Sequence, residues 1–130
     1  MKNKSTQKVI ILQPKEELTE RFELYRGPIA GLMYYIGHSK CILGAYLQMV
    51  HERSNRFDSC AIKLTVGSFP PHIVGYVPRN LAHDLHLARS LGWTGFKCRI
   101  VHINRRTVSW SYIIISITAN SPVKDERKFL

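Results

Sequence analysis

The chain has 130 residues, the length of one small globular domain. Hydrophobic residues make up 45% of it and charged residues 22%, a composition that excludes a disordered chain. The formal net charge is +10, and residues 27–123 alone hold ten Lys and Arg against three Asp and Glu. This excess favours polyanionic partners, nucleic acid before an anionic membrane surface, although a basic protein without such a partner would look the same.

The three cysteines, Cys41, Cys60 and Cys98, are widely spaced and form no CxxC pair. This pattern predicts neither a disulfide framework nor a cysteine zinc site and is typical of reduced thiols. The N-terminal apolar run is too short for a secretory signal, and the longest apolar stretch, YIIISI, has the length of a strand. We therefore expect an intracellular protein without a membrane partner, nuclear in a eukaryote and otherwise cytoplasmic.

Three regions are expected along the chain. Residues 1–26 form an N-terminal arm with a possible strand at residues 9–12, residues 27–120 form the domain, and residues 121–130 form a polar tail. Short runs of β-branched and aromatic residues, bounded by Gly, Pro, Asn and Ser, predict a mainly β fold, an antiparallel sheet or barrel of six strands. These runs are residues 23–37, 44–52, 60–66, 72–77, 95–103 and 110–118.

The segment at residues 78–92 departs from the strand pattern. Its apolar residues have a helical spacing and are Leu81, Leu85, Ala88 and Leu91. We expect one amphipathic helix between the fourth and fifth strands, with Asn80 as its N-cap and Gly92 just past its end.

The composition argues against catalysis. Acid–base hydrolases and two-metal nucleases need several carboxylates, and the three acids of the domain cannot easily supply them. His83 and His86 lie three apart on the expected helix and could hold a metal, but no third ligand is indicated nearby. We therefore interpret them as solvent-facing residues and expect no metal site and no cofactor.

Binding of single-stranded nucleic acid requires cations for the phosphates and aromatic faces for the bases. The motif GLMYYIG supplies Tyr34 and Tyr35. In a strand these two side chains point to opposite faces, unless the flanking Gly31 and Gly37 bend the chain. Phe57 is a further candidate. Taken alone, all three aromatics are as readily explained as core or rim residues of a barrel.

The motif GYVPRN places Arg79 just before the expected helix. Free backbone N–H groups and the positive end of the helix dipole would assist this cation in binding a phosphate. A solvated loop residue explains Arg79 equally well.

Three motifs in this order, GLMYYIG, NRFDSCAIKL and VGYVPRNLAHDL, resemble the HIRAN domain family. This family is known as an N-terminal module of fork-remodelling SWI/SNF-type helicases and as a standalone domain. The resemblance covers about residues 27–118. The chain departs from it where ERSNRFD replaces a stretch that often reads EP-N-P-Y-D, and where Met33 replaces an arginine of the helicase member.

The resemblance implies a six-stranded barrel related to the OB type, with one or two helices, that binds single-stranded DNA at a free 3′-hydroxyl end. Its two adjacent tyrosines would pack on and hydrogen-bond the terminal nucleotide, Phe57 would flank the base and Arg79 would take a phosphate. Tyr76 falls in the DNA-facing turn and Trp110 lies near a late aromatic of the family. The candidate DNA-binding residues are Met33, Tyr34, Tyr35, Phe57, Asp58, Tyr76, Arg79 and Trp110.

Asp58 is the acid among these candidates. A carboxylate repels a phosphate but accepts hydrogen bonds from a hydroxyl. Placed where the next phosphate would lie, it rejects a strand that continues and holds a strand that stops. The stretch SNRFDS is also turn-like, so Asp58 as an acceptor for its own backbone is the alternative, and the two roles are compatible.

We therefore expect a non-enzymatic DNA-end-binding module that could guide a helicase or nuclease to a 3′ terminus in DNA repair or replication-fork processing. No feature indicates self-association, so a monomer is expected. The alternative is a small-barrel module that binds a peptide or partner protein in a groove lined by the aromatics.

Overall fold

The computed structural model describes residues 20–106 and 112–122. Their strands form one antiparallel sheet in the order β1-β6-β5-β2-β3-β4. The strands are β1 (Arg21–Pro28), β2 (Tyr46–His51), β3 (Ile62–Val66), β4 (His72–Tyr76), β5 (Thr94–Ile103) and β6 (Ile113–Asn120). Within these residues one α-helix, α2 (Arg79–Ser90), lies between β4 and β5. The expected mainly β fold of six antiparallel strands with a helix is confirmed.

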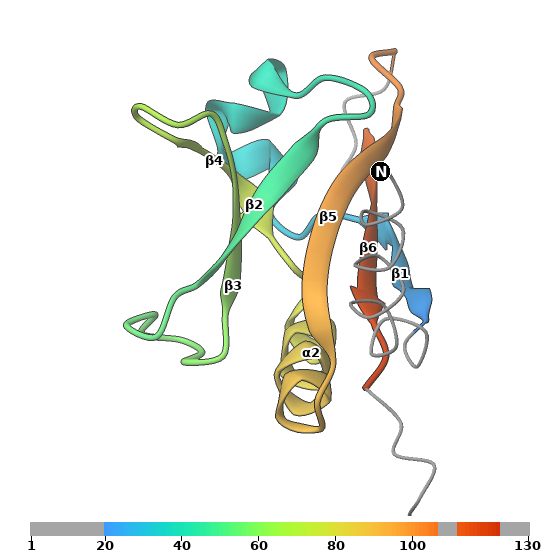
Figure 1. Ribbon diagram of the computed structural model, residues 1–130. Coiled ribbons are helices and arrows are strands. Elements are labelled where there is room, and N and C mark those ends of the chain that lie inside the picture. The colour runs from blue at the N-terminus through green and yellow to red at the C-terminus, as the bar shows by residue number, and fades with distance from the viewer. Residues whose placement is uncertain (1–19, 107–111, 123–130) are drawn as a thin grey trace, which may run out of the picture.

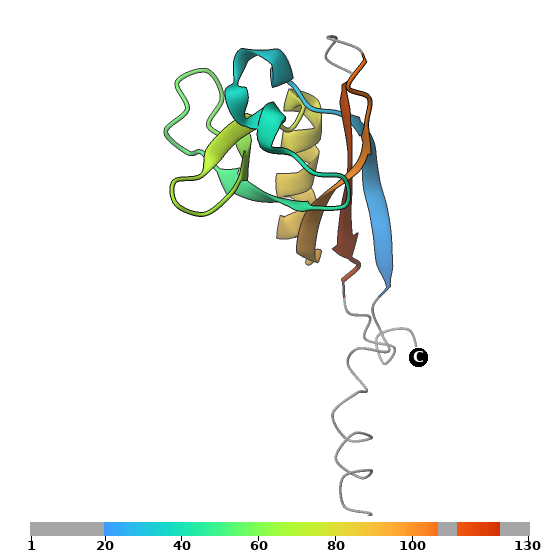
Figure 2. The same cartoon turned by 90° about the horizontal axis from the view of Figure 1, so that it is seen from above.

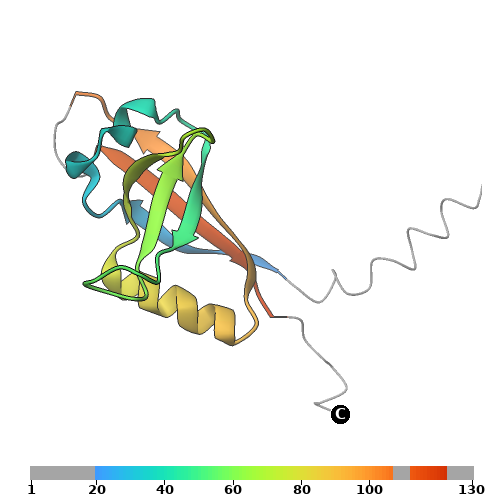
Figure 3. The ribbon, with the colours of Figure 1, turned by 90° about the vertical axis from the view of Figure 1, so that its left-hand side faces the viewer.

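The sheet has two halves that meet at a short ladder between β2 and β5. These strands pair at Tyr46↔Arg99 and Leu47↔Cys98. Figure 1 shows β1, β6 and β5 on one side of the resulting opening and β2, β3 and β4 on the other. Figure 3 shows the second group in front of the first, with its strands crossing those behind. The sheet therefore folds over itself into an OB-like shape without closing into a complete barrel.

A single bridge links the two outer strands of this sheet. Ala30, just past β1, and Tyr76, at the end of β4, exchange two backbone hydrogen bonds of 2.8 and 2.9 Å. The helix α2 starts three residues after Tyr76 and covers one open end of the sheet (Figures 1 and 2). Bridge and helix together fix the positions of Tyr76 and Arg79.

The core lies between the two halves of the sheet and α2. Ile113, Ile115 and Ile117 alternate along β6 and are fully buried, which explains why this isoleucine run forms a central strand. Ala82 and Leu85 are the buried residues of α2. Burial of each large aliphatic side chain contributes about 1.5–3 kcal/mol, so these strands and the helix are held as one unit.

The helix begins two residues earlier than expected, so Arg79 is its first residue. Pro78, not Asn80, is its N-cap, and the Pro78 carbonyl accepts the Ala82 N–H at 2.9 Å. Pro78 has an extended backbone with ψ of 140°, so the helical turn starts directly after it, and no side chain caps the helix. The expected end is confirmed, because Gly92 follows the C-cap with a φ of 103°.

The segment GLMYYIG is not a strand, which corrects the expectation that its tyrosines alternate across a sheet. It contributes to two 3₁₀ helices, η2 (Leu32–Tyr34) and η3 (Ile36–Lys40). Gly31, with a φ of 71°, turns the chain away from β1, and its carbonyl accepts the Tyr34 N–H at 3.0 Å. Gly37 lies so close to the Ile73 carbonyl that a methyl group would collide with it.

The strand bounds can be set against the expected regions. β1 begins at Arg21 and so crosses the boundary expected between residues 26 and 27, whereas β6 ends at Asn120. The possible strand at residues 9–12 lies outside the described residues. In the part of the chain that the structure describes, no helix combines the length and the hydrophobicity needed to cross a membrane.

Candidate nucleic-acid interface

The loop between β2 and β3 is shaped by its own polar side chains. Asn55 Oδ1 accepts the backbone N–H groups of Phe57 at 2.9 Å and of Asp58 at 3.0 Å. Asp58 Oδ1 accepts the Cys60 N–H at 2.9 Å. Short Asn and Asp side chains favour such turns because they bond backbone groups two or three residues on. The alternative role weighed for Asp58, an acceptor within its own turn, is therefore present in the structure.

The Asp58 carboxylate also contacts the start of α2. His83 Nε2 lies 3.1 and 3.2 Å from its two oxygens, and Arg79 Nε lies 3.5 Å away. The pKa of Asp58 is lowered by the Cys60 N–H, against an opposing effect of burial, and further by His83 and Arg79. The carboxylate is therefore ionised at neutral pH. Its side chain is 13% exposed and that of Arg79 is 71% exposed, so the carboxylate is mostly covered while the guanidinium faces solvent.

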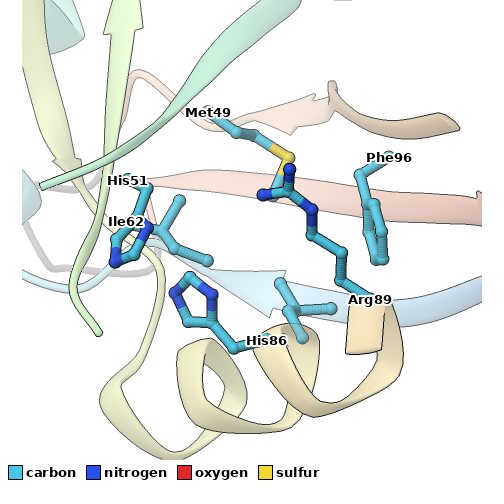
Figure 4. A pocket seen from close by; sticks show the side chains of 7 residues that line it. Met49, His51, Ile62, His86, Arg89 and Phe96 are labelled. Carbon is cyan, nitrogen blue, oxygen red and sulfur yellow. The ribbon is translucent and has the colours of Figure 1, made fainter. Parts of the chain in front are cut away.

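Two further histidines hold the end of the same loop. His51 Nε2 lies 2.8 Å from the Ser59 carbonyl, and His86 Nε2 lies 2.9 Å from the Cys60 carbonyl. Their ring centroids are 4.2 Å apart. Figure 4 shows both rings in the wall of a pocket of about 120 Å³, together with apolar side chains and an arginine. His86 is thus half-buried and bonded, which corrects the expectation of a solvent-facing residue.

Tyr35 and Tyr76 form an aromatic pair beside this loop. Their ring centroids are 6.1 Å apart at 55°. The Tyr76 hydroxyl donates to Glu52 Oε1 at 2.7 Å, and Asn55 Nδ2 donates to the same oxygen at 2.8 Å. Burial and the neighbouring Glu52 raise the pKa of Tyr76. Tyr76 is therefore a neutral donor that ties the aromatic pair to the loop that carries Asp58.

The other candidates lie at the surface. Tyr34 is 87% exposed, Phe57 83% and Met33 44%. Within the described residues, no hydrogen bond or ring contact of their side chains joins these three to the Tyr35–Tyr76 pair or to Asp58. Trp110 lies outside the described residues. The structure thus brings Asp58 to Arg79 and Tyr35 to Tyr76, and it leaves the side chains of the other three candidates exposed to solvent.

Residues that sequence reasoning did not place at the site are Glu52, Asn55, His51, Cys60 and His86. The turn-like stretch SNRFDS signals the loop and the Asn55 turn. The partners of the loop on β2, β4 and α2 depend on the tertiary fold, so nothing in the sequence marks Glu52 or His86 as its supports.

The model of the HIRAN domain family matches residues 22–119. The chain belongs to the HIRAN domain family. HIRAN domains are known as DNA-binding modules and are binding domains rather than catalytic ones.

Two solved structures share the fold of this HIRAN domain. The HIRAN domain of human HLTF has a TM-score of 0.62 and 18% identity, and the alignment covers 88% of each chain. A protein from Lactobacillus plantarum has a TM-score of 0.60 and 12% identity, over 79% of this chain and 98% of the other. No curated protein sequence matches the chain.

Proposed function

We propose that this HIRAN domain binds single-stranded DNA at a free 3′-hydroxyl end. The observation that carries the proposal is an ionised carboxylate, Asp58, which is held in a partly exposed position between a fixed loop and the start of α2. The rest of the domain is strongly basic. An acid fixed within such a domain weakens the general binding of phosphates near it. We therefore infer that Asp58 selects between strand ends rather than adding to affinity.

The aromatic residues supply faces for bases. Tyr35 and Tyr76 offer a paired face beside the loop, and the exposed rings of Tyr34 and Phe57 are free to stack. Each stacked base contributes about 1–3 kcal/mol and does so for any base. This part of the interface therefore binds single strands without reading their sequence.

In this proposal Asp58 reads the end of the strand and Arg79 positions the strand. A hydroxyl that donates to the Asp58 carboxylate gains about 1.5–3 kcal/mol, whereas a phosphate at the same place meets a like charge. Arg79 is 71% exposed, so its guanidinium is accessible to a phosphate of the bound strand. His83 and the Cys60 N–H keep the carboxylate in place.

This activity suits a module that directs a helicase or nuclease to a 3′ terminus during DNA repair or replication-fork processing. Family membership and the site geometry support binding, and we assign the domain no catalytic step. In this proposal the exposed rings bind the bases, the net positive charge attracts the strand, and Asp58 distinguishes its end.

The test compares two oligonucleotides of one sequence, ending in a 3′-hydroxyl or a 3′-phosphate, by fluorescence anisotropy. The unmutated protein should prefer the hydroxyl by about tenfold or more, from the hydrogen-bond energy above. Asp58→Asn should lose most of this preference while retaining general affinity. Asp84→Asn is the matched control, because Asp84 is an exposed acid on α2. Equal affinity of the unmutated protein for both ends would refute the proposal.

A second candidate function is the binding of a peptide or partner protein, which the partly apolar pocket of Figure 4 favours. Met49, Phe96 and Arg89 line this pocket, and Figure 4 shows the Arg89 side chain between the other two. Salt separates the two candidates, since affinity for DNA falls steeply with ionic strength while an apolar peptide groove depends on it weakly.

A further inference from the structure

We propose that Asp58, Cys60 and His83 form a binding site for a divalent cation of the zinc type. Their carboxylate, thiol and imidazole ligand atoms all lie within 4.8 Å of one another. On a tetrahedral zinc ion with bonds of about 2.0–2.3 Å, neighbouring ligand atoms lie about 3.3–3.6 Å apart. The 3.1 Å contact between Asp58 and His83 is already near that spacing, and a shift of about 1 Å brings the thiol to it.

The three donors are the ligand types that zinc takes in proteins: an oxygen, a sulfur and a nitrogen. The sequence places Asp58 and Cys60 two apart in a loop, and His83 on a helix that follows two strands later. His86, which lies three residues further along the same helix, is not part of this donor set, because its Nε2 is hydrogen-bonded to the Cys60 carbonyl. Three protein ligands leave a fourth position open for water or another small ligand.

The backbone around the donors is held from several sides. The Cys60 N–H is bonded by Asp58 and its carbonyl by His86, while Asn55 bonds the Asp58 N–H. Figure 4 shows His86 next to His51, which bonds the preceding carbonyl of the loop. Such outer contacts orient the ligands of a metal site and raise its affinity, so the site requires little rearrangement to bind a metal.

Binding of the ion is a balanced exchange. The Cys60 thiol releases its proton and ligates as a thiolate, and the His83 proton that faces Asp58 moves to Nδ1 or leaves the ring. Two anionic ligands then neutralise the dication. Arg79, which lies 3.5 Å from Asp58, is displaced, and its 71% exposure allows this movement into solvent.

The test is a titration of DNA-free protein with zinc chloride in competition with a chromophoric chelator. The unmutated protein should bind one equivalent, and Cys60→Ser and His83→Ala should each weaken binding by about tenfold or more. His102→Ala is the control for loss of a histidine, because His102 is exposed on β5. Unfolding midpoints of all variants in the absence of zinc separate loss of a ligand from loss of the fold.

Cobalt(II) gives a second readout that reports the ligand itself. The unmutated protein should show a thiolate-to-metal charge-transfer band, and Cys60→Ser should lack it while His102→Ala keeps it. The proposal would be overturned if the unmutated protein bound zinc no more tightly than Cys60→Ser and His83→Ala do. Cobalt binding by the unmutated protein without the thiolate band would overturn it as well. Neither measurement involves DNA, so the result is independent of the end-binding function.

Discussion

The side chains of Asp58 and His83 meet at 3.1 Å across 25 residues of the chain. This contact joins the β2–β3 loop to α2, while Glu52 joins the start of the same loop to Tyr76 on β4. Because α2 starts three residues after Tyr76, both attachments belong to one continuous stretch of chain. The loop that carries the candidate residues is therefore fixed at both ends, and each attachment can be tested.

Tyr76→Phe should lower the free energy of unfolding by about 1.5–3 kcal/mol, the value of a hydrogen bond to a charged group. The change removes the hydroxyl that donates to Glu52 at 2.7 Å and keeps the ring that faces Tyr35. Urea unfolding measures the effect. Tyr34→Phe should leave stability unchanged, because that ring is 87% exposed, and equal effects of the two changes would contradict the assignment.

Glu52 should make stability depend on pH on the acid side. Hydrogen bonds from Asn55 and Tyr76, with a smaller effect of Lys63, hold its pKa below the usual 4.5, against an opposing effect of burial. Its contribution is therefore complete above the unfolded-state pKa and is lost as the pH falls through the folded-state pKa. The loss of unfolding free energy between pH 7 and a pH below 4.5 should be smaller in Glu52→Gln than in the unmutated protein. An unaltered pH dependence in that variant would show that other carboxylates dominate.

Arg79→Gln should weaken binding of oligonucleotides with 3′-hydroxyl and 3′-phosphate ends by the same factor, because a phosphate contact positions the strand without reading its end. The slope of log affinity against log salt should become shallower by about 0.7, the value for one phosphate contact on a single strand. Arg89→Gln, an exposed arginine of the same helix, is the control. A change in the ratio of the two affinities would assign Arg79 a different role.

The three cysteines should react with iodoacetamide at very different rates at pH 8. Burial raises the pKa of the Cys41 thiol to about 11 and that of Cys98 to about 12, so both remain protonated and unreactive. Cys60 is only partly buried. Mass spectrometry of a time course should therefore find Cys60 modified first, and more slowly when zinc chloride is present. Comparable rates at all three positions would contradict this order.

Zinc should reduce the preference for a 3′-hydroxyl end, if both the end-binding function and the metal site hold. A bound dication neutralises Asp58, which then no longer repels a terminal phosphate. The affinity for the 3′-hydroxyl end divided by that for the 3′-phosphate end should be lower in saturating zinc than in EDTA for the unmutated protein. In Cys60→Ser this ratio should be the same in both conditions. A zinc effect of equal size in that variant would place the ion elsewhere.

Local patterns were sufficient for most of the fold. The β-branched runs predicted the strands, and the spacing of Leu81 and Leu85 with Gly92 predicted the helix and its end. The 3₁₀ segments were missed because they depend on a long-range fit, the close approach of Gly37 to the Ile73 carbonyl. A local pattern of aromatic and apolar residues reads the same in a strand and in such a turn.

The candidate site was predictable only in its separate parts. Asp58 and Arg79 were both identified from motifs, and their ion pair follows from the packing of the loop against α2. His83 was weighed as a metal ligand with His86, yet the fold turns His86 toward a carbonyl and brings Asp58 and Cys60 to His83. Spacing along one helix does not reveal which side chains approach from a loop some 25 residues earlier.

The short ladder between β2 and β5 gives the two halves of the sheet a hinge line. Two residue pairs join them there, and Met49 and Phe96 line a pocket beside this ladder. Side-chain volume along this pocket therefore contributes, beside the backbone bridge at Ala30 and Tyr76, to the angle between the halves. We therefore expect the size of the side chain at positions 49 and 96 to matter more than its type, because a shortened side chain at either position would leave the contact between the halves less well packed.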